Sequence, residues 1–193
     1  FYEMFFDDAI VTSRELELTL TGKECGLAER APTCGVPHHA IDTYVARLVE
    51  KGYRVAIGEQ MQDPSLAKGL VERDIIRIIT PGTLTDSTVI GERRNNFLCA
   101  VCISGKRCGL SWCDVSTGEF YAQQLPFEEA SLRSALLSLN PGEIITADAD
   151  AISPLCPVRP HLYSASAFQP AKAQEALFEH FELDSYNTLI VLL

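Results

Sequence analysis

Residues 40–57 have the sequence Ala40-Ile-Asp-Thr-Tyr-Val-Ala-Arg-Leu-Val-Glu-Lys-Gly-Tyr-Arg-Val-Ala-Ile57, which predicts a helix followed at once by a strand. The helix, residues 40–51, has apolar side chains at the i, i+3, i+4 and i+7 spacing of one helical face, namely Ile41, Tyr44, Val45 and Leu48. Gly52 suits the left-handed turn at which a helix ends, and residues 53–57 are typical of a strand. Residues 73–79 predict a second strand. This order of elements indicates a mixed α/β domain.

The rest of the first half contains weaker patterns. Residues 16–20 alternate apolar and polar side chains and predict a strand. Residues 21–33 are polar, contain two glycines and predict a loop, and residues 34–38 predict a turn into the helix. Thr80-Pro81-Gly82-Thr83 ends the second strand sharply. We therefore assign residues 1–84 to one domain.

The second half follows a polar segment, residues 85–96, which we interpret as a linker. Three strands joined by short turns are predicted next, at residues 96–104, 107–115 and 118–124. After them we expect a helix, a fourth strand, an irregular segment and a last helix, at residues 126–139, 143–146, 148–170 and 171–181. A three-stranded meander followed by a helix resembles the start of an RNase H-like fold, so we expect residues 97–193 to form a second α/β domain of that type.

The apolar end of the chain, residues 188–193, has neither a cap nor a turn. This indicates a second domain that is incomplete at its C-terminus, and hence a fragment of a longer protein. No apolar run approaches the roughly 20 residues that a membrane span requires, so we expect no membrane partner.

The charge of the chain limits how it could bind nucleic acid. The formal net charge is -10 at pH 7. Residues 1–90 contain 9 Lys and Arg against 14 Asp and Glu, and residues 91–193 contain 7 against 12, so each half carries -5. A free-standing nucleic-acid binder usually has a basic footprint. Attraction to phosphates therefore cannot supply most of any affinity for DNA.

Seven cysteines are a high and odd number for 193 residues. Cys99 and Cys102 have the spacing of zinc ligands, with Cys108 and Cys113 as further candidates. However, the first two lie in a strand-like run, where residues i and i+3 face opposite sides, whereas zinc-binding pairs occupy tight turns. We therefore expect reduced cysteines in a cytoplasmic protein and no metal site.

The enzyme class that the second half suggests is a metal-dependent nuclease. RNase H-like nucleases hold two Mg²⁺ ions with an Asp of the first strand and further carboxylates. Asp114 lies at a predicted strand end, with Glu119, Glu143 and Asp148 as candidate companions. Residues 114–118 are equally typical of a turn in which Asp stabilises the backbone. The chain has no phosphate-binding loop and no dinucleotide-binding glycine motif, so we expect no nucleotide site of these two kinds here.

Phe1 and Glu3 form a candidate ligand site at the start of the chain. In an extended segment, residues i and i+2 point to the same face. A ring can stack on a flat ligand such as a nucleobase while a neighbouring carboxylate forms a directional hydrogen bond. The same residues are also common at the start of a buried element. Candidate phosphate contacts, which are equally typical of solvated surface charges, are Lys23, Lys68, Arg73 and Arg77.

Six segments resemble, in order and spacing, the MutS family of bacterial DNA mismatch repair proteins. They are Phe1-Tyr-Glu-Met-Phe-Phe-Asp-Asp-Ala9, Cys34-Gly-Val-Pro-His-His-Ala40, Val55-Ala-Ile-Gly-Glu-Gln60 with Asp63-Pro64, Gly69-Leu-Val-Glu-Arg73, Arg77-Ile-Ile-Thr-Pro-Gly-Thr83, and Leu110 to Phe120 with its Asp-x-Ser-x-Gly turn. The first five are spread, in order, across residues 1–84. The last resembles the RNase H-like connector domain of the family.

The resemblance implies a mismatch-recognition domain followed by a connector domain. It implies that Phe1 stacks on a mispaired base and that Glu3 forms a hydrogen bond with that base. Lys23 and Arg77 are the basic residues that we assign to the DNA contact. A relative that acts in another DNA transaction, such as recombination, and a nuclease built on the second half remain the alternatives.

The resemblance also implies partners outside this chain. The full-length family protein is a dimer with an ATPase that uses ATP and Mg²⁺. We therefore expect mismatched duplex DNA, a second MutS subunit and, through the connector, a MutL-type repair protein as partners. ATP and Mg²⁺ belong to the full-length protein, and no catalytic, cofactor-binding or metal-binding residue is expected in residues 1–193.

Overall fold

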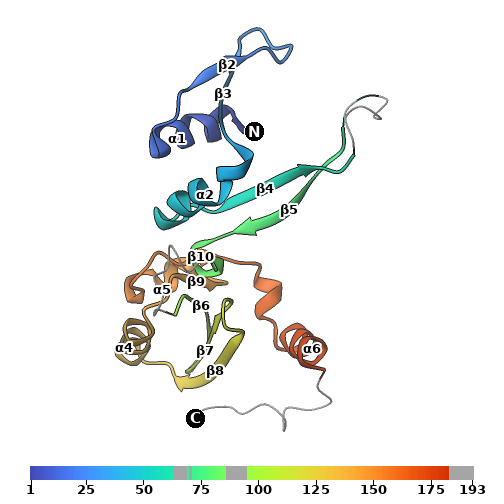
Figure 1. Cartoon of the computed structure of the whole chain (residues 1–193). Helices are drawn as coiled ribbons and strands as arrows, with labels where there is room; N and C mark the ends of the chain where they lie inside the picture. Colours follow the sequence, from blue (N-terminus) through green and yellow to red (C-terminus); the bar gives the residue numbers. More distant parts are fainter. Residues whose placement is uncertain (63–68, 70, 86–94, 183–193) are drawn as a thin grey trace. The chain divides into compact units, whose positions relative to one another are not determined.

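The computed structural model describes residues 1–62, 69, 71–85 and 95–182, and it divides the chain into two compact units. The first unit is Phe1–Pro81 and the second is Gly82–Leu193 (Figure 1). Both contain helices and strands, which confirms the predicted α/β class. Most of the predicted linker and the apolar end of the chain lie outside the described residues.

The first unit contains a three-stranded antiparallel sheet. Its strands, in the order β1-β3-β2, are Tyr2–Phe5, Ala31–Val36 and Thr21–Lys23. Helix α1 (Phe6–Leu16) packs against β3, where the Cys34 thiol donates a hydrogen bond to the carbonyl oxygen of Ala9 at 3.4 Å. The 3-10 turn η1 (His38–Ala40) leads into helix α2 (Ile41–Glu50).

The strand that we predicted at residues 16–20 does not form: helix α1 ends at Leu16, and residues 17–20 belong to no helix or strand. The buried side chains of α1 follow the i, i+3, i+7 spacing of one helical face and are Ala9, Thr12 and Leu16. Glu17 then adopts a left-handed conformation, with φ of 57°, and ends the helix. The alternation that starts at Leu16 was therefore misleading, because Leu16 belongs to the buried face of a helix.

The predicted loop at residues 21–33 and turn at residues 34–38 were partly wrong. Strand β2 lies inside the predicted loop, and β3 runs from Ala31 through Val36, so the turn begins only at Pro37. These strands are held by pairing with each other and with β1. Such pairing joins residues that are distant in sequence, so no local pattern indicates it.

Helix α2 and β5 agree with the prediction, whereas β4 begins at Val55 and ends at Gln60 instead of spanning residues 53–57. Gly52, with φ of 86°, follows the helix, and its N–H donates to the carbonyl oxygen of Val49 at 2.8 Å. Strands β4 (Val55–Gln60) and β5 (Arg73–Ile79) pair antiparallel as a separate ribbon, with a bulge between Ile57 and Gly58. All described pairings of the first unit are antiparallel, and the mixed sheet belongs to the second unit.

The second unit is built on one five-stranded mixed sheet in the order β10-β9-β6-β7-β8 (Figure 1). Its strands are, in chain order, β6 (Phe97–Ser104), β7 (Arg107–Asp114), β8 (Glu119–Pro126), β9 (Glu143–Thr146) and β10 (His161–Leu162). The first three form an antiparallel meander, and β9 runs parallel to β6, as β10 does to β9. This is the strand order of the RNase H-like fold, which confirms that prediction.

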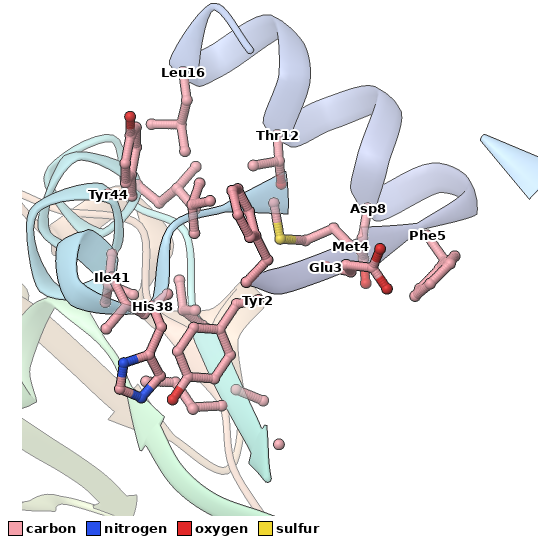
Figure 2. Close-up of a pocket in the computed structure, with 18 of the residues that line it drawn as sticks. Tyr2, Glu3, Met4, Phe5, Asp8, Thr12, Leu16, His38, Ile41 and Tyr44 are labelled. Carbon is pink, nitrogen blue, oxygen red and sulfur yellow. The ribbon is translucent and has the colours of Figure 1, made fainter. Parts of the chain in front are cut away.

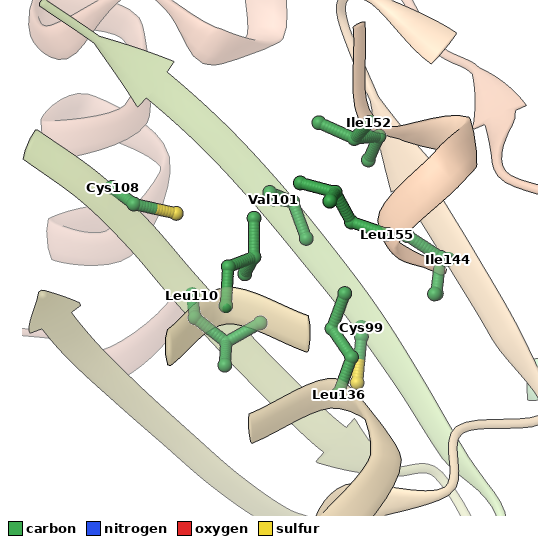
Figure 3. Close-up of a cluster of buried hydrophobic side chains, with 9 residues drawn as sticks. Cys99, Val101, Cys108, Leu110, Leu136, Ile144, Ile152 and Leu155 are labelled. Carbon is green, nitrogen blue, oxygen red and sulfur yellow. The ribbon is translucent and has the colours of Figure 1, made fainter. Parts of the chain in front are cut away.

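Helices cover both faces of this sheet. Helix α4 (Glu129–Leu139), helix α5 (Ala149–Ile152) and the 3-10 turn η3 (Ser153–Leu155) supply the core side chains of one face, which Figure 3 shows packed against Val101 and Leu110. On the other face, Phe181 of α6 (Pro170–Phe181) lies against Phe120, with ring centroids 5.6 Å apart. Residues 148–170, predicted as irregular, contain α5, η3, β10 and the 3-10 turn η4 (Ala165–Phe168).

Candidate nucleic-acid interface

Phe1 and Glu3 lie on the same exposed face of the three-stranded sheet. Glu3 pairs with Gly35 across the β1–β3 ladder, and Phe1 immediately precedes the first paired residue, Tyr2. The side chain of Phe1 is 86% exposed, and that of Glu3 is 43% exposed. A free aromatic ring and a carboxylate therefore project from one strand in the same direction, as the i, i+2 spacing predicts.

Gly35 forms the surface beneath these two side chains. A Cβ atom on Gly35 would lie 3.1 Å from the backbone oxygen of Tyr2, 3.7 Å from Cγ of Glu3 and 3.8 Å from Cδ1 of Phe1. The contact with the backbone oxygen of Tyr2 is tight, whereas the other two are ordinary van der Waals distances, so a side chain larger than that of alanine would crowd Phe1 and Glu3. Gly35 belongs to the segment of residues 34–40 quoted above. Nothing in that segment indicates that Gly35 lies opposite Glu3.

Lys23 joins Phe1 and Glu3 on this face. Its Nζ lies 2.6 Å from Oε2 of Glu3 and 5.4 Å from the centroid of the Phe5 ring. The Lys23 side chain is 49% exposed, so the ion pair is in contact with water. The result is a surface, which we call the probe face, that combines a free ring, a carboxylate and a cation; its residues are Phe1, Glu3, Phe5, Lys23 and Gly35.

Tyr2 points to the opposite side of β1. Its ring stacks on the ring of His38, with centroids 5.5 Å apart and an angle of 12° between the planes. Its hydroxyl donates a hydrogen bond to Oε1 of Glu59 on β4. Figure 2 shows Tyr2 beside His38, with Glu3 and Phe5 directed away from both. The hydrogen bond to Glu59, burial and the nearby negative charges of Glu59 and Asp42 raise the pKa of Tyr2.

Of the other basic candidates, Arg77 is not grouped with the probe face, whereas Arg73 shares a cavity with it. Arg77 lies on β5, in the second sheet of the unit, and its Nη1 is 3.8 Å from Oδ1 of Asp42 on α2. Arg73, at the start of β5, lines a cavity of about 1060 Å³ that Phe1 and Glu3 also line. Lys68 lies outside the described residues. The structure thus brings together Phe1, Glu3 and Lys23, whereas Arg77 comes from a different sheet.

Comparison with known proteins decides the family. The model of MutS domain I matches residues 1–88, and the model of MutS domain II matches residues 96–189. The chain belongs to the MutS family. The DNA mismatch repair protein MutS of Ruminiclostridium cellulolyticum is 45% identical over 197 residues, which cover 97% of this chain and 23% of that protein.

Two other relatives named DNA mismatch repair protein MutS are similar over a shorter region. That of Acetivibrio thermocellus is 53% identical over 75% of this chain, and one from Clostridium botulinum is 52% identical over 75% of it. The alignments span 17% and 16% of these two proteins. The chain therefore spans less than a quarter of the length of the curated relatives it matches.

In this MutS-family chain, Asp114 stabilises a turn. Its Oδ1 accepts hydrogen bonds from the backbone N–H and the hydroxyl of Ser116, at 2.9 and 2.6 Å, and its Oδ2 accepts one from the N–H of Asn96 at 3.0 Å. Burial would raise the pKa of Asp114, but hydrogen bonds from Ser116, Asn96 and Thr117 outweigh it and leave the pKa below its usual value. The carboxylate of Asp114 thus stabilises the turn through Ser116 and is held from outside the turn by Asn96, and the nuclease alternative is not favoured.

Of the candidate companions of Asp114, Glu119 pairs with it across β7 and β8, while the other two have contacts of their own. Glu143 is buried and accepts a hydrogen bond from the N–H of Gly82 at 3.1 Å, and Asp148 accepts one from the N–H of Ala151 at 3.1 Å as the cap of α5. Within residues 1–62, 69, 71–85 and 95–182, no three His, Cys, Asp or Glu side chains gather in a way that would hold a metal ion.

The cysteines of this MutS-family chain are all free. Cys99 lies in the core of the second unit (Figure 3). Cys102, on the same strand, is only partly buried. Burial, followed by the neighbouring Cys113, raises the pKa of the Cys99 thiol to about 12. A thiol in this state is a packed apolar group at neutral pH. Among the residues that the structure describes, no helix is both long and apolar enough to cross a membrane.

Proposed function

We propose that this chain recognises mispaired or unpaired bases in duplex DNA as part of DNA mismatch repair. The observation that carries the proposal is the probe face, where the 86% exposed ring of Phe1 stands beside the carboxylate of Glu3. Membership of the MutS family supports it. In this proposal Phe1 stacks on a base and Glu3 forms a hydrogen bond with that base.

The physical basis is the lower cost of opening a mispaired step. A mismatch has weaker pairing and stacking than a matched pair, so wedging a ring into it and bending the duplex costs less there. Stacking is nearly indifferent to base identity, so one phenylalanine can serve many mismatches. Glu3 adds a directional contact, which tests the orientation of the base.

Charge supports a probing role for this chain within a larger protein. With a net charge of -10, the chain gains little from attraction to phosphates. In this proposal Lys23 and Arg77 make local contacts with the DNA backbone, and most phosphate contacts come from the remainder of a protein as long as the relatives. Lys23 also offsets the charge of Glu3, which would otherwise be repelled as it approaches the duplex.

The remaining functions are proposed for the full-length protein. It would hydrolyse ATP with Mg²⁺ at a site outside this chain, while residues 1–193 would carry no catalytic residue and no cofactor. It would act in the cytoplasm as a homodimer. The second unit would serve as the connector domain through which a MutL-type repair protein docks.

A binding titration tests the proposal. The full-length protein is titrated at one salt concentration with matched duplex, a duplex with a single mismatch, and branched DNA. We expect the mismatched duplex to bind at least about tenfold more tightly than the matched one, a difference of about 1.4 kcal/mol. Equal affinity for the first two would contradict the proposal, and a preference for branched DNA would favour a recombination role.

A further inference from the structure

We infer that Tyr2 is a positioning residue, which sets the direction of the two probe side chains on either side of it through its contacts with Glu59 and His38. The inference rests on the proposed function, and it assigns a role to a residue that does not itself touch the base. It starts from the sequence order, because Tyr2 separates Phe1 from Glu3 in the chain.

The contacts of Tyr2 come from two different elements. The stacked ring of His38 belongs to η1, at the entrance to α2, and the carboxylate of Glu59 belongs to β4. Stacking fixes the plane of the phenol ring, and the hydrogen bond fixes its end. Tyr2 is therefore held in both direction and rotation.

These contacts link the probe strand to a separate sheet. Strand β1 pairs with β3 in the three-stranded sheet, whereas β4 pairs with β5. Tyr2 and Glu59 both line the cavity of about 1060 Å³. Their hydrogen bond thus joins two walls of this cavity.

The backbone transmits the position of Tyr2 to its neighbours. Peptide planes are rigid, so the Cα atom of Tyr2 lies at a fixed distance from those of Phe1 and Glu3. Only the φ and ψ angles set the direction of the chain between them. The β1–β3 ladder begins at Tyr2, which leaves Phe1 before the first paired residue. If the phenol were released, β1 could shift at its start, and Phe1 would lose the position that it has over Gly35.

The test uses variants of the full-length protein that remove the hydrogen bond. Tyr2→Phe keeps the stacked ring but removes the hydroxyl that donates the hydrogen bond. Glu59→Ala removes the acceptor, whereas Glu59→Gln keeps an acceptor oxygen at that position. We expect the first two to lower the preference for a single mismatch over matched duplex by about fivefold, the effect of one hydrogen bond. Glu59→Gln should keep most of the preference, and matched-duplex affinity should not change.

A fluorescent base and a matched control separate positioning from folding. With 2-aminopurine at the mismatch, Tyr2→Phe should reduce the fluorescence change that stacking by Phe1 produces. Tyr121→Phe is the control, because Tyr121 also stacks on a ring, that of Trp112 at 5.5 Å, but in the second unit. It should leave both the preference and the fluorescence unchanged.

The outcomes distinguish this inference from the proposed function. A wild-type mismatch preference that persists in Tyr2→Phe and Glu59→Ala would overturn the inference alone. A loss of affinity for matched and mismatched DNA by the same factor would also overturn it, because that is the result of a structural role. If the wild-type protein shows no mismatch preference, the proposed function fails, and the inference fails with it.

Discussion

At the scale of the residue, the site depends as much on an absent side chain as on those present. Phe1 and Glu3 stand over Gly35, whose missing Cβ leaves the space that they use. Nζ of Lys23 forms an ion pair with Oε2 of Glu3 at 2.6 Å. A side chain larger than that of alanine at this position would crowd both probe side chains, so we expect the position opposite Glu3 to require a small residue.

Substitution of Gly35 tests this requirement. Valine would bring its Cβ to 3.1 Å from the backbone oxygen of Tyr2 and its methyl groups against Phe1 and Glu3. We expect Gly35→Val in the full-length protein to reduce the mismatch preference by roughly tenfold, or about 1.4 kcal/mol, as measured by competitive binding. Gly109→Val is the control, because the nearest atom to a Cβ there is 3.9 Å away. An unchanged mismatch preference in Gly35→Val would show that recognition does not need a small residue opposite Glu3.

The sequence predicted much of the probe face, for a physical reason. The period of two in an extended segment placed Phe1 and Glu3 together before any fold was considered. The positions of Gly35, Lys23 and Glu59 could not be predicted in the same way. They depend on which strands pair and in which register, and residues 3 and 35 or 2 and 59 are brought together only by the folded chain.

At the scale of the element, the helical spacing of apolar residues predicted a helix correctly, whereas the alternation at residues 16–20 did not mark a strand. The helix at residues 41–50 follows its pattern closely, because burial of one face is recorded in a few consecutive residues. The strand at residues 73–79 has the predicted bounds, although only Ile79 among its residues is buried. Helix α1 was missed because its last buried residue also begins an alternating run. Strands β2 and β3 were missed in part because they are stabilised by distant partners.

The turn between β7 and β8 provides a prediction about stability at acid pH. Asp114 is buried and its lowered pKa reflects hydrogen bonds to the charged form. Because the folded pKa lies below the unfolded value of about 3.9, this stabilisation is present above that pH and is lost as the pH falls through the folded pKa. We expect Asp114→Asn to lose about 1–3 kcal/mol at pH 7, as measured by urea unfolding of this chain.

The same measurement at low pH checks the cause. The difference between wild type and Asp114→Asn should shrink as the pH falls below the unfolded value of about 3.9 and through the lower pKa of the folded carboxyl group. Asp148→Asn is the control, because asparagine caps a helix about as well as aspartate does, so its stability should match the wild type at pH 7. A difference for Asp114→Asn that stays constant with pH would contradict this explanation.

At the scale of the whole molecule, the chain is two α/β units with an acidic charge of -10. Such a molecule gains little from the polyanionic backbone of DNA, so its contribution to recognition must come from contacts that differ between matched and mismatched steps. The probe face, at the start of the first unit, is where such contacts are available. The central claim is therefore that the ring of Phe1 supplies the preference for a mismatch.

Replacement of Phe1 by alanine in the full-length protein tests this claim most directly. The measurement is the ratio of Kd for matched duplex to Kd for a single mismatch, at one salt concentration, in wild type, Phe1→Ala and Phe6→Ala. Phe6 is the control, because it is also exposed, at 52%, but lies at the start of α1. We predict that the ratio falls to about one in Phe1→Ala, with matched-duplex affinity unchanged, while Phe6→Ala keeps the wild-type ratio. A wild-type ratio in Phe1→Ala would contradict the claim.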